Sequence, residues 1–189
     1  MFPYWFYFMV LVALVGMPGA GKSIAADFFV SKKFAMVYFG GIVLDETKKR
    51  GLELNEPNER RVREELRQLH GMAAMAFLST PKIRGLLEKK QDVVIDDLYS
   101  WSELVTLKQE FEEIITIAIF ASPETRYARM AKRKERHLTR EQCISRDRAE
   151  IENLEKGGPI AMADYTIINE GTQKEFEKQL ISVLKKIKK

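Results

Sequence analysis

The chain has 189 residues, of which 46% are hydrophobic and 31% charged, with a net charge of +4 at pH 7. This balance predicts one globular domain with its own core, and the modest charge argues against nucleic-acid binding as the main role. The single cysteine, Cys143, excludes an intrachain disulfide and fits a reducing compartment, so we expect a cytoplasmic protein.

The first 17 residues carry no charge. They lack a preceding basic region and run directly into a glycine-rich loop, so we expect no membrane segment. The aromatic stretch 1–8 (MFPYWFYF) extends the first strand, covers a sheet edge or precedes a natural start at Met9. The sequence leaves these alternatives open.

A glycine-rich loop follows the first predicted strand. The apolar run 9–15 (MVLVALV) predicts a buried parallel strand, and residues 16–23 (GMPGAGKS) match the P-loop, or Walker A, pattern G-x-x-x-x-G-K-[ST]. Residues 24–33 predict a helix with Phe28 and Phe29 on one face. Strand, loop and helix in this order form the context in which the motif binds nucleotide phosphates.

Each residue type in the loop serves phosphate binding. The glycines let the backbone turn its N–H groups inward, in conformations that a side chain would hinder. Lys22 supplies a cation for the β- and γ-phosphates of ATP, and Ser23 supplies a hydroxyl ligand for Mg²⁺. The residues predicted to contact the phosphates are Gly16, Gly19, Ala20, Gly21, Lys22, Ser23 and Ile24.

Strands and helices alternate along the rest of the chain. Further strands are predicted at 35–39, 92–96, 114–121 and 163–168. Further helices are predicted at 42–50, 59–70, 72–78, 81–90, 101–111, 123–136, 139–155 and 172–188. This pattern predicts a three-layer α/β fold, in which helices cover both faces of a five-stranded parallel sheet.

Local signals set several of these boundaries. Gly40 and Gly41 should end the second strand, Pro81 should open a helix, and residues 157–159 (GGP) should end one. The apolar residues of helix 59–70 that are spaced for one buried face are Val62, Leu66 and Leu69.

A P-loop needs an acidic partner for its metal ion. Asp96 and Asp97 follow the buried run VVI, at the carboxyl end of a strand, where ligands of such folds bind. A carboxylate there holds Mg²⁺ or accepts the proton of an acceptor group. We favour Asp96 for the metal, and a role as turn residue is equally compatible with Asp97.

Arginines dominate the segment after the fourth predicted strand. Arg126, Arg129, Arg133 and Arg136 are spaced by three and four residues along one helix face, where they would neutralise a transferred phosphoryl group. Arg126 and Arg133 are the leading candidates for this catalytic role. Weaker candidates, on the second arm of a lid that closes over ATP, are Arg140, Arg146 and Arg148.

Together these stretches carry a resemblance. The motifs GMPGAGKS, VVIDD, SPETRYARMAKR and ADYTIINEG resemble the nucleoside-monophosphate-kinase-like group of P-loop proteins, and most of all dephospho-CoA kinase-like proteins and their archaeal relatives. The resemblance implies the sheet order 2-3-1-4-5, an acceptor-binding region at about 40–90 and a lid at about 125–155. It also implies that Asn169, Glu170 and Gly171 lie beside the adenine.

The acceptor side departs from this family. Kinases of the adenylate type carry a G-D-x-x-R stretch after the second strand, where this chain has Gly41 and Leu44 in place of the Asp and Arg. The D-G-x-x-R stretch after the third strand is replaced by 96–100 (DDLYS), again without Arg. Arginines of helix 59–70, Arg67 above all, are the replacements that we consider, and a solvated helix face is an equal alternative.

These observations predict a single-domain P-loop kinase that uses Mg·ATP. The acceptor is a small nucleotide-like molecule, with dephospho-CoA leading by resemblance and a nucleoside monophosphate second. An alternative of another class is a nucleotide-binding switch with little kinase activity, suggested by the missing acceptor arginines. A third is an ATPase that acts on RNA or a protein, suggested only by the basic excess.

Overall fold

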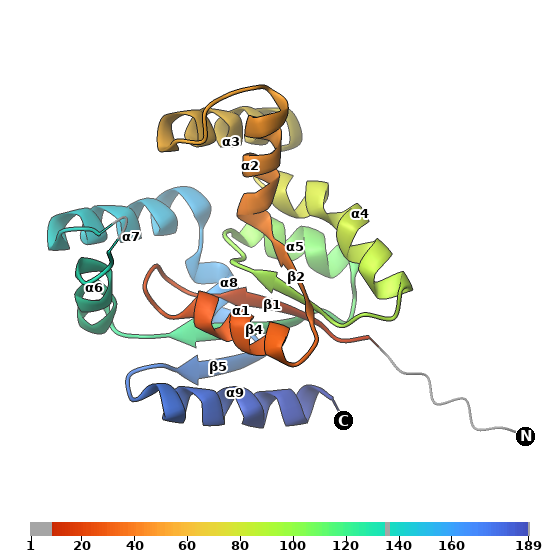
Figure 1. Ribbon diagram of the computed structural model, residues 1–189, viewed down its shortest axis with the longest axis vertical. Coiled ribbons are helices and arrows are strands. Elements are labelled where there is room, and N and C mark those ends of the chain that lie inside the picture. Colours follow the sequence, from red (N-terminus) through yellow and green to blue (C-terminus); the bar gives the residue numbers. More distant parts are fainter. Residues whose placement is uncertain (1–8, 135–136, 189) are drawn as a thin grey trace, which may run out of the picture.

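Five parallel strands form one sheet in the order β2-β3-β1-β4-β5, which confirms the predicted order. The computed structural model describes residues 9–134 and 137–188, so the alternatives for residues 1–8 and the prediction for Arg136 lie outside the described residues. The strands are β1 (Leu11–Val15), β2 (Ala35–Tyr38), β3 (Val93–Asp96), β4 (Ile115–Phe120) and β5 (Tyr165–Ile168) (Figure 1).

Helices cover both faces of the sheet, as predicted. They are α1 (Lys22–Ser31), α2 (Phe39–Lys49), α3 (Glu56–His70), α4 (Ala74–Glu88), α5 (Trp101–Glu110), α6 (Pro123–Ala131), α7 (Arg140–Leu154), α8 (Gly157–Ala161) and α9 (Gln173–Ile187). Within the described residues, no helix has the length and apolar composition that a membrane crossing needs.

The central strand β1 shows how the two cores form. Side chains of a strand alternate between the two faces of the sheet, so a strand covered on both faces must be apolar throughout. Ala13 and Val15 join a core made with α2, α3, α4 and α5, whereas Val12 and Leu14 join a second core with α1 and α9. All of β1 is buried, which fixes the place where its following loop emerges.

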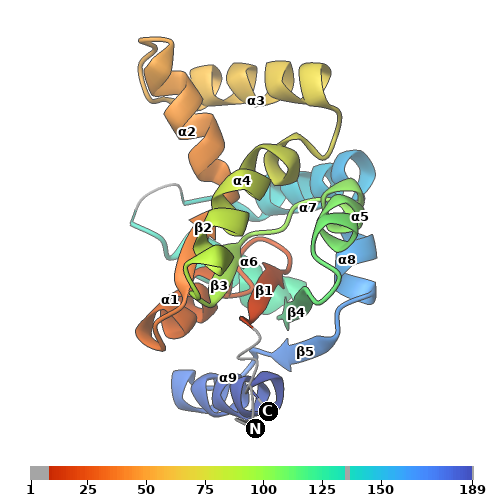
Figure 2. The same cartoon turned by 90° about the vertical axis from the view of Figure 1, so that its right-hand side faces the viewer.

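The helices α2 and α3 extend away from the sheet and lie on one side of the molecule (Figures 1 and 2). The prediction that Gly40 and Gly41 end the second strand needs correction, because β2 already ends at Tyr38 and both glycines belong to the first turn of α2. Val62 and Leu66 of α3 are buried as predicted. Leu69 is 75% exposed, because it lies in the last turn of α3, where the chain turns away at Gly71.

Two other local predictions are wrong. Pro81 opens no helix and lies inside α4, since Ala76, Ser79 and Ile83 form one continuous buried face whose packing outweighs the helix-breaking tendency of proline. Residues 157–159 belong to the short helix α8, because the left-handed Glu155 (φ 51°) has already ended α7.

A capping box fixes the start of α5, directly after the loop that leaves β3. The Ser100 side chain accepts a hydrogen bond from the Glu103 amide, and Glu103 Oε2 accepts from the Tyr99 and Ser100 amides at 2.7 and 3.2 Å. Glu103 is completely buried, and its Oε1 has no partner among the described residues. Burial raises the pKa of Glu103 to about 7.

Glu103→Gln should reduce the pH dependence of stability. The pKa of Glu103 is higher in the folded than in the unfolded protein. The contribution of Glu103 to stability is therefore complete at pH values below its unfolded-state pKa and is lost as the pH rises through about 7. Glutamine keeps the capping hydrogen bonds and does not ionise. Between pH 5 and 8 we expect the free energy of unfolding of the wild type to fall by roughly 2–3 kcal/mol more than that of the variant. Parallel urea titrations would disprove the expectation if the two proteins follow the same pH profile.

Candidate functional site

A cavity of about 550 Å³ lies at the carboxyl edge of the sheet, where β1 and β3 end. Its walls come from the P-loop, the ends of β2 and β3, the helices α6 and α7, and the turn between β5 and α9. The sequence-predicted residues that line it are Gly19, Gly21, Lys22, Ser23, Ile24, Asp96, Arg129, Arg133, Asn169 and Gly171. Gly16, Ala20 and Arg126 are predicted site residues that do not line it.

The P-loop begins where the buried strand β1 ends. Gly19 and Gly21 adopt φ values of 82° and 108°, in the left-handed region that favours glycine. Lys22 opens α1 and folds back over the loop, where its Nζ donates to the carbonyl groups of Gly16 at 2.7 Å and Met17 at 3.3 Å. Burial lowers the pKa of Lys22.

Two side chains from distant segments hold the outside of the P-loop. Asn169, which follows β5, donates from its side-chain amide to the carbonyl oxygen of Ala20 at 2.8 Å. Arg126 of α6 donates from Nη1 to the carbonyl oxygen of Pro18 at 3.0 Å. Ala20 therefore contributes its backbone to the support of the loop, while its side chain is buried in the core.

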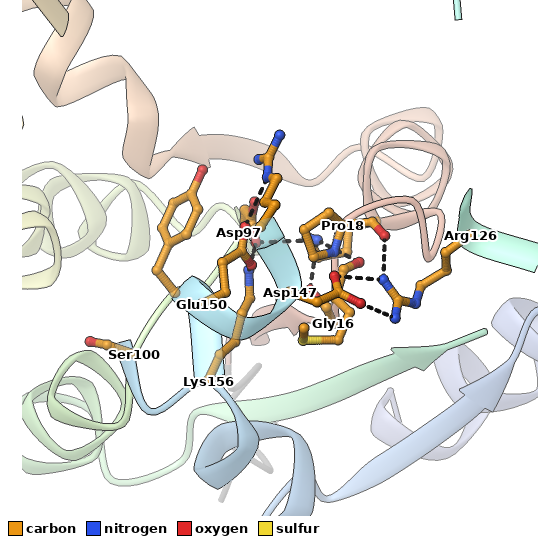
Figure 3. A network of polar contacts seen from close by, with 12 residues as sticks. Gly16, Pro18, Asp97, Ser100, Arg126, Asp147, Glu150 and Lys156 are labelled. Atoms are coloured by element: carbon orange, nitrogen blue, oxygen red, sulfur yellow. Dashed lines mark hydrogen bonds and ion pairs between the residues drawn. The ribbon is translucent and has the colours of Figure 1, made fainter. Parts of the chain in front are cut away.

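The prediction that Arg126 faces a transferred phosphoryl group needs correction. Arg126 is 3% exposed, and its Nη1 and Nη2 form a bidentate pair with Asp147 of α7 at 2.9 and 2.6 Å. Its Nε donates to the carbonyl oxygen of Ala121. Every nitrogen of Arg126 thus binds a protein oxygen, so Arg126 links α7 to the P-loop and is directed at protein groups instead of the cavity (Figure 3).

The two carboxylates after β3 have different environments. Asp96 is half-buried and lines the cavity, and burial together with the neighbouring Asp97 raises its pKa to about 6. Asp97 adopts a left-handed backbone conformation (φ 66°) that directs its Oδ1 to within 3.4 Å of Lys22 Nζ. The same oxygen lies 3.3 Å from the Nζ of Lys156, so one carboxylate serves two lysines.

Arginines from α6, from the segment that follows its end at Ala131, and from α7 form the cationic wall of the cavity. Arg129, Arg133 and Arg146 line it. Arg129 Nη2 donates to the Asn169 carbonyl at 2.8 Å, while its buried Nη1 has no partner among the described residues. A buried donor without a partner, beside a cavity, fits an anionic or carbonyl-bearing ligand. The weaker candidate Arg146 thus lies closer to the ligand space than Arg126.

Other sequence candidates lie elsewhere. Glu170 is exposed and accepts hydrogen bonds from Ser122 and Thr125, so it caps the start of α6 and does not line the cavity. Arg140 forms an exposed pair with Glu124, and Arg148 lines a shallow hollow on another part of α7.

Several residues of the site carry no strong sequence signal. Tyr38 and Tyr99 enter the cavity from the ends of β2 and β3, and Gln173 and Phe176 enter it from the first turns of α9. Their positions after strand ends were a usable signal, since ligands of parallel α/β sheets bind there. Lys156 directly precedes α8 and belongs to no motif, yet it is fully buried.

The arginines of α3 differ in their surroundings. Arg60 and Arg61 form exposed ion pairs with glutamates one turn further along the helix. Arg67 is partly buried, and its Nε has no partner among the described residues. Burial lowers the pKa of Arg67, and the nearby Glu103 carboxyl of α5 opposes this shift. Arg67 therefore lies near Glu103 in the first turn of α5, and it does not line the cavity.

Breaking the Arg126–Asp147 pair should be far more costly than breaking an exposed pair between the same two helices. Asp147→Asn leaves a buried guanidinium without its counter-charge, and we expect a loss of about 3–5 kcal/mol in the free energy of unfolding. Glu124→Gln breaks the exposed pair with Arg140 and should cost less than about 1 kcal/mol. Similar losses for the two variants, measured by urea unfolding, would contradict the role of Arg126 as a structural link.

Comparisons with known proteins agree with this architecture. A solved structure of shikimate kinase from Bacteroides thetaiotaomicron has a TM-score of 0.62 and 12% identity, covering 96% of this chain and 99% of that one. A gluconokinase from Sinorhizobium meliloti 1021 has a TM-score of 0.58 and 13% identity, covering 95% and 94%. At these identities the likeness shows the fold, which is that of a P-loop small-molecule kinase.

Sequence comparison gives the family. A family model described as an AAA domain matches residues 12–157, and this P-loop domain implies nucleotide binding. The UPF0200 protein of the archaeon Thermococcus gammatolerans is 41% identical over 183 residues, covering 94% of this chain and 95% of the relative. The UPF0200 protein PH1008 of Pyrococcus horikoshii is 31% identical over 182 residues, covering 94% and 97%. The chain therefore belongs to the archaeal UPF0200 family and carries a P-loop domain of the AAA type.

Proposed function

We propose that this protein is a phosphotransferase that moves the γ-phosphoryl group of ATP to a small nucleotide-like acceptor. The observation that carries the proposal is the composition of the cavity, which brings the P-loop, a strand-end carboxylate and arginines of two further helices into one space. Phosphoryl transfer needs positioning and charge neutralisation more than covalent chemistry, and these residue types supply both.

We assign roles in ATP binding and phosphoryl transfer to residues on the ATP side of the cavity. The P-loop amides and Lys22 bind the β- and γ-phosphates. Arg133 and Arg146 neutralise the negative charge of the γ-phosphoryl group while it is transferred. The bond from the γ-phosphorus to the β-phosphate oxygen breaks, a bond to the acceptor oxygen forms, and ADP leaves. An acceptor hydroxyl releases its proton to solvent water in this step. Asn169, Gly171 and Phe176 line the cavity from the turn after β5 and from α9, and we propose that the base binds beside them.

Ser23 and Asp96 fit a magnesium ion held jointly with the phosphates. Both line the cavity, and hydroxyl and carboxylate oxygens are the ligands that Mg²⁺ prefers. The described residues contain no cluster of three or more His, Cys, Asp or Glu side chains that would bind a metal alone, which is expected when the nucleotide completes the coordination. When bound, Mg²⁺ supplies charge neutralisation on the phosphate oxygens.

The acceptor would bind between the region 40–90 and a lid formed by residues 125–155. Dephospho-CoA is the leading acceptor by resemblance, and a nucleoside monophosphate is second. The partly buried Arg67 supports an anionic acceptor on this side. A nucleotide-binding switch is the second candidate function, favoured by Gly41 and Leu44, which cannot grip an acceptor phosphate.

A panel of acceptors with labelled ATP tests the proposal. We expect transfer to dephospho-CoA or to one nucleoside monophosphate, and a rate at least about a hundredfold lower for Lys22→Ala, because one preorganised cation at the phosphates is lost. Lys178→Ala, which removes an exposed lysine of α9, is the matched control and should leave the rate unchanged. ATP binding without transfer to any acceptor would refute the kinase and favour the switch.

The raised pKa of Asp96 predicts a pH dependence of Mg·ATP binding. A protonated carboxyl cannot ligate the metal, so the affinity for Mg·ATP should weaken as the pH falls through about 6. Asp96→Asn should bind Mg·ATP weakly at every pH and lose this step. Calorimetric titrations between pH 5 and 8 provide the measurement, and an Asp96→Asn protein that retains the wild-type step would exclude Asp96 as its source.

A further inference from the structure

A buried lysine outside every sequence motif completes the charges of the site. Lys156 lies between α7 and α8 and is fully buried. Its Nζ lies 2.7 Å from Glu150 Oε2 and 3.3 Å from Asp97 Oδ1, and 4.8 Å from the ring centroid of Tyr99 (Figure 3). These anionic and aromatic partners offset the cost of burying the ammonium group, and on balance its pKa is raised.

The contacts of Lys156 belong to a continuous chain of charges. At one end, Asp97 Oδ1 also pairs with Lys22 of the P-loop at 3.4 Å. At the other end, Glu150 Oε1 accepts from Nε of Arg146 at 3.2 Å, and Arg146 lines the cavity. Lys156 therefore stands midway between the P-loop lysine and the arginine of α7.

Lys22 must change partners when a triphosphate binds. Its ammonium group now serves the Gly16 carbonyl and Asp97, whereas the proposed function requires it at the β- and γ-phosphates. Asp97 would then be a carboxylate beside Asp96 and a polyanion, with like charges a few ångströms apart. A carboxylate in that position needs another cation, and Lys156 already contacts the same oxygen atom.

We propose that Lys156 is a positioning residue that retains the Asp97 carboxylate when Lys22 turns to the nucleotide phosphates. The proposal rests on the proposed function, since it requires a triphosphate in the cavity. It assigns Lys156 no contact with the nucleotide. Of its two carboxylate partners, Asp97 is the one through which Lys156 acts on the affinity, because Glu150 keeps Arg146 as a second cation. That distinguishes the role from both a purely structural one and direct contact with a phosphate.

Calorimetric measurement of the affinity for Mg·ATP and for AMP tests this assignment. Lys156→Met should weaken ATP binding about tenfold or more, because Asp97 then competes for Lys22 and repels the phosphates. AMP carries no β- or γ-phosphate, so its affinity should change much less. Lys156→Arg, which keeps the charge, should restore most of the affinity for ATP.

The decisive comparison adds Asp97→Asn. In a protein that already carries Asp97→Asn, the further exchange Lys156→Met should change the affinity for ATP by less than about threefold. This comparison between Asp97→Asn and the double variant stands even if Lys156→Met alone fails to fold, because the double variant removes both buried charges together.

Each result decides one point. If Lys156→Met binds ATP like the wild type, or if the double variant binds ATP far more weakly than Asp97→Asn, the assignment of Lys156 is overturned while the kinase proposal stands. Equal losses for ATP and AMP would indicate a merely structural role and would also overturn it. A wild-type protein that binds no nucleoside triphosphate would overturn both proposals.

Discussion

A loop that turns its amide groups inward to bind phosphates must turn its carbonyl groups outward, and those carbonyls need hydrogen-bond donors. In this protein the donors come from three separate parts of the chain. Lys22 serves Gly16, Arg126 serves Pro18, and Asn169 serves Ala20. The conformation of the P-loop is therefore inseparable from the packing of α6 and of the turn after β5.

This requirement propagates through the rest of the site. A guanidinium group buried beside a carbonyl needs a counter-charge, and Asp147 of α7 provides it. The two helices that supply cationic residues to the cavity are thereby joined to the loop they face. Asn169 also links a helix to the loop. Arg129 of α6 donates to the backbone carbonyl of Asn169, and the side-chain amide of Asn169 donates to the carbonyl of Ala20. Residues that support the loop and residues that face the ligand are direct neighbours.

The carboxylates after β3 face the opposite problem, since a polyanion is expected beside them. Burial and the proximity of the pair raise the pKa of Asp96, whereas Asp97 is held between Lys22 and Lys156. One carboxyl is thus available to a metal ion and the other is neutralised by protein cations. This division of roles suits the phosphoryl transfer that we propose, in which the charge on the ligand changes.

Much of the fold and of the nucleotide site was determined by the sequence alone. The motif GMPGAGKS, the apolar runs of the strands and the alternation of strands with helices specify a parallel sheet with a phosphate-binding loop, because these features depend on local periodicity and on glycine conformation. The resemblance supplied the strand order, which the structure confirms. The predicted cavity residues Lys22, Asp96, Arg129 and Asn169 do come together at the strand ends.

The tertiary structure alone decided which charged residues face the ligand and which support the fold. Arg126 and Arg129 have the same side chain and lie on the same helix, yet Arg126 is buried against Asp147 and Arg129 lines the cavity. Lys156 belongs to no sequence motif and is buried between two carboxylates. Local sequence places a side chain on a face of its own element. Whether that face meets a carboxylate, a carbonyl or a cavity depends on segments far away in the chain, whose positions only packing establishes.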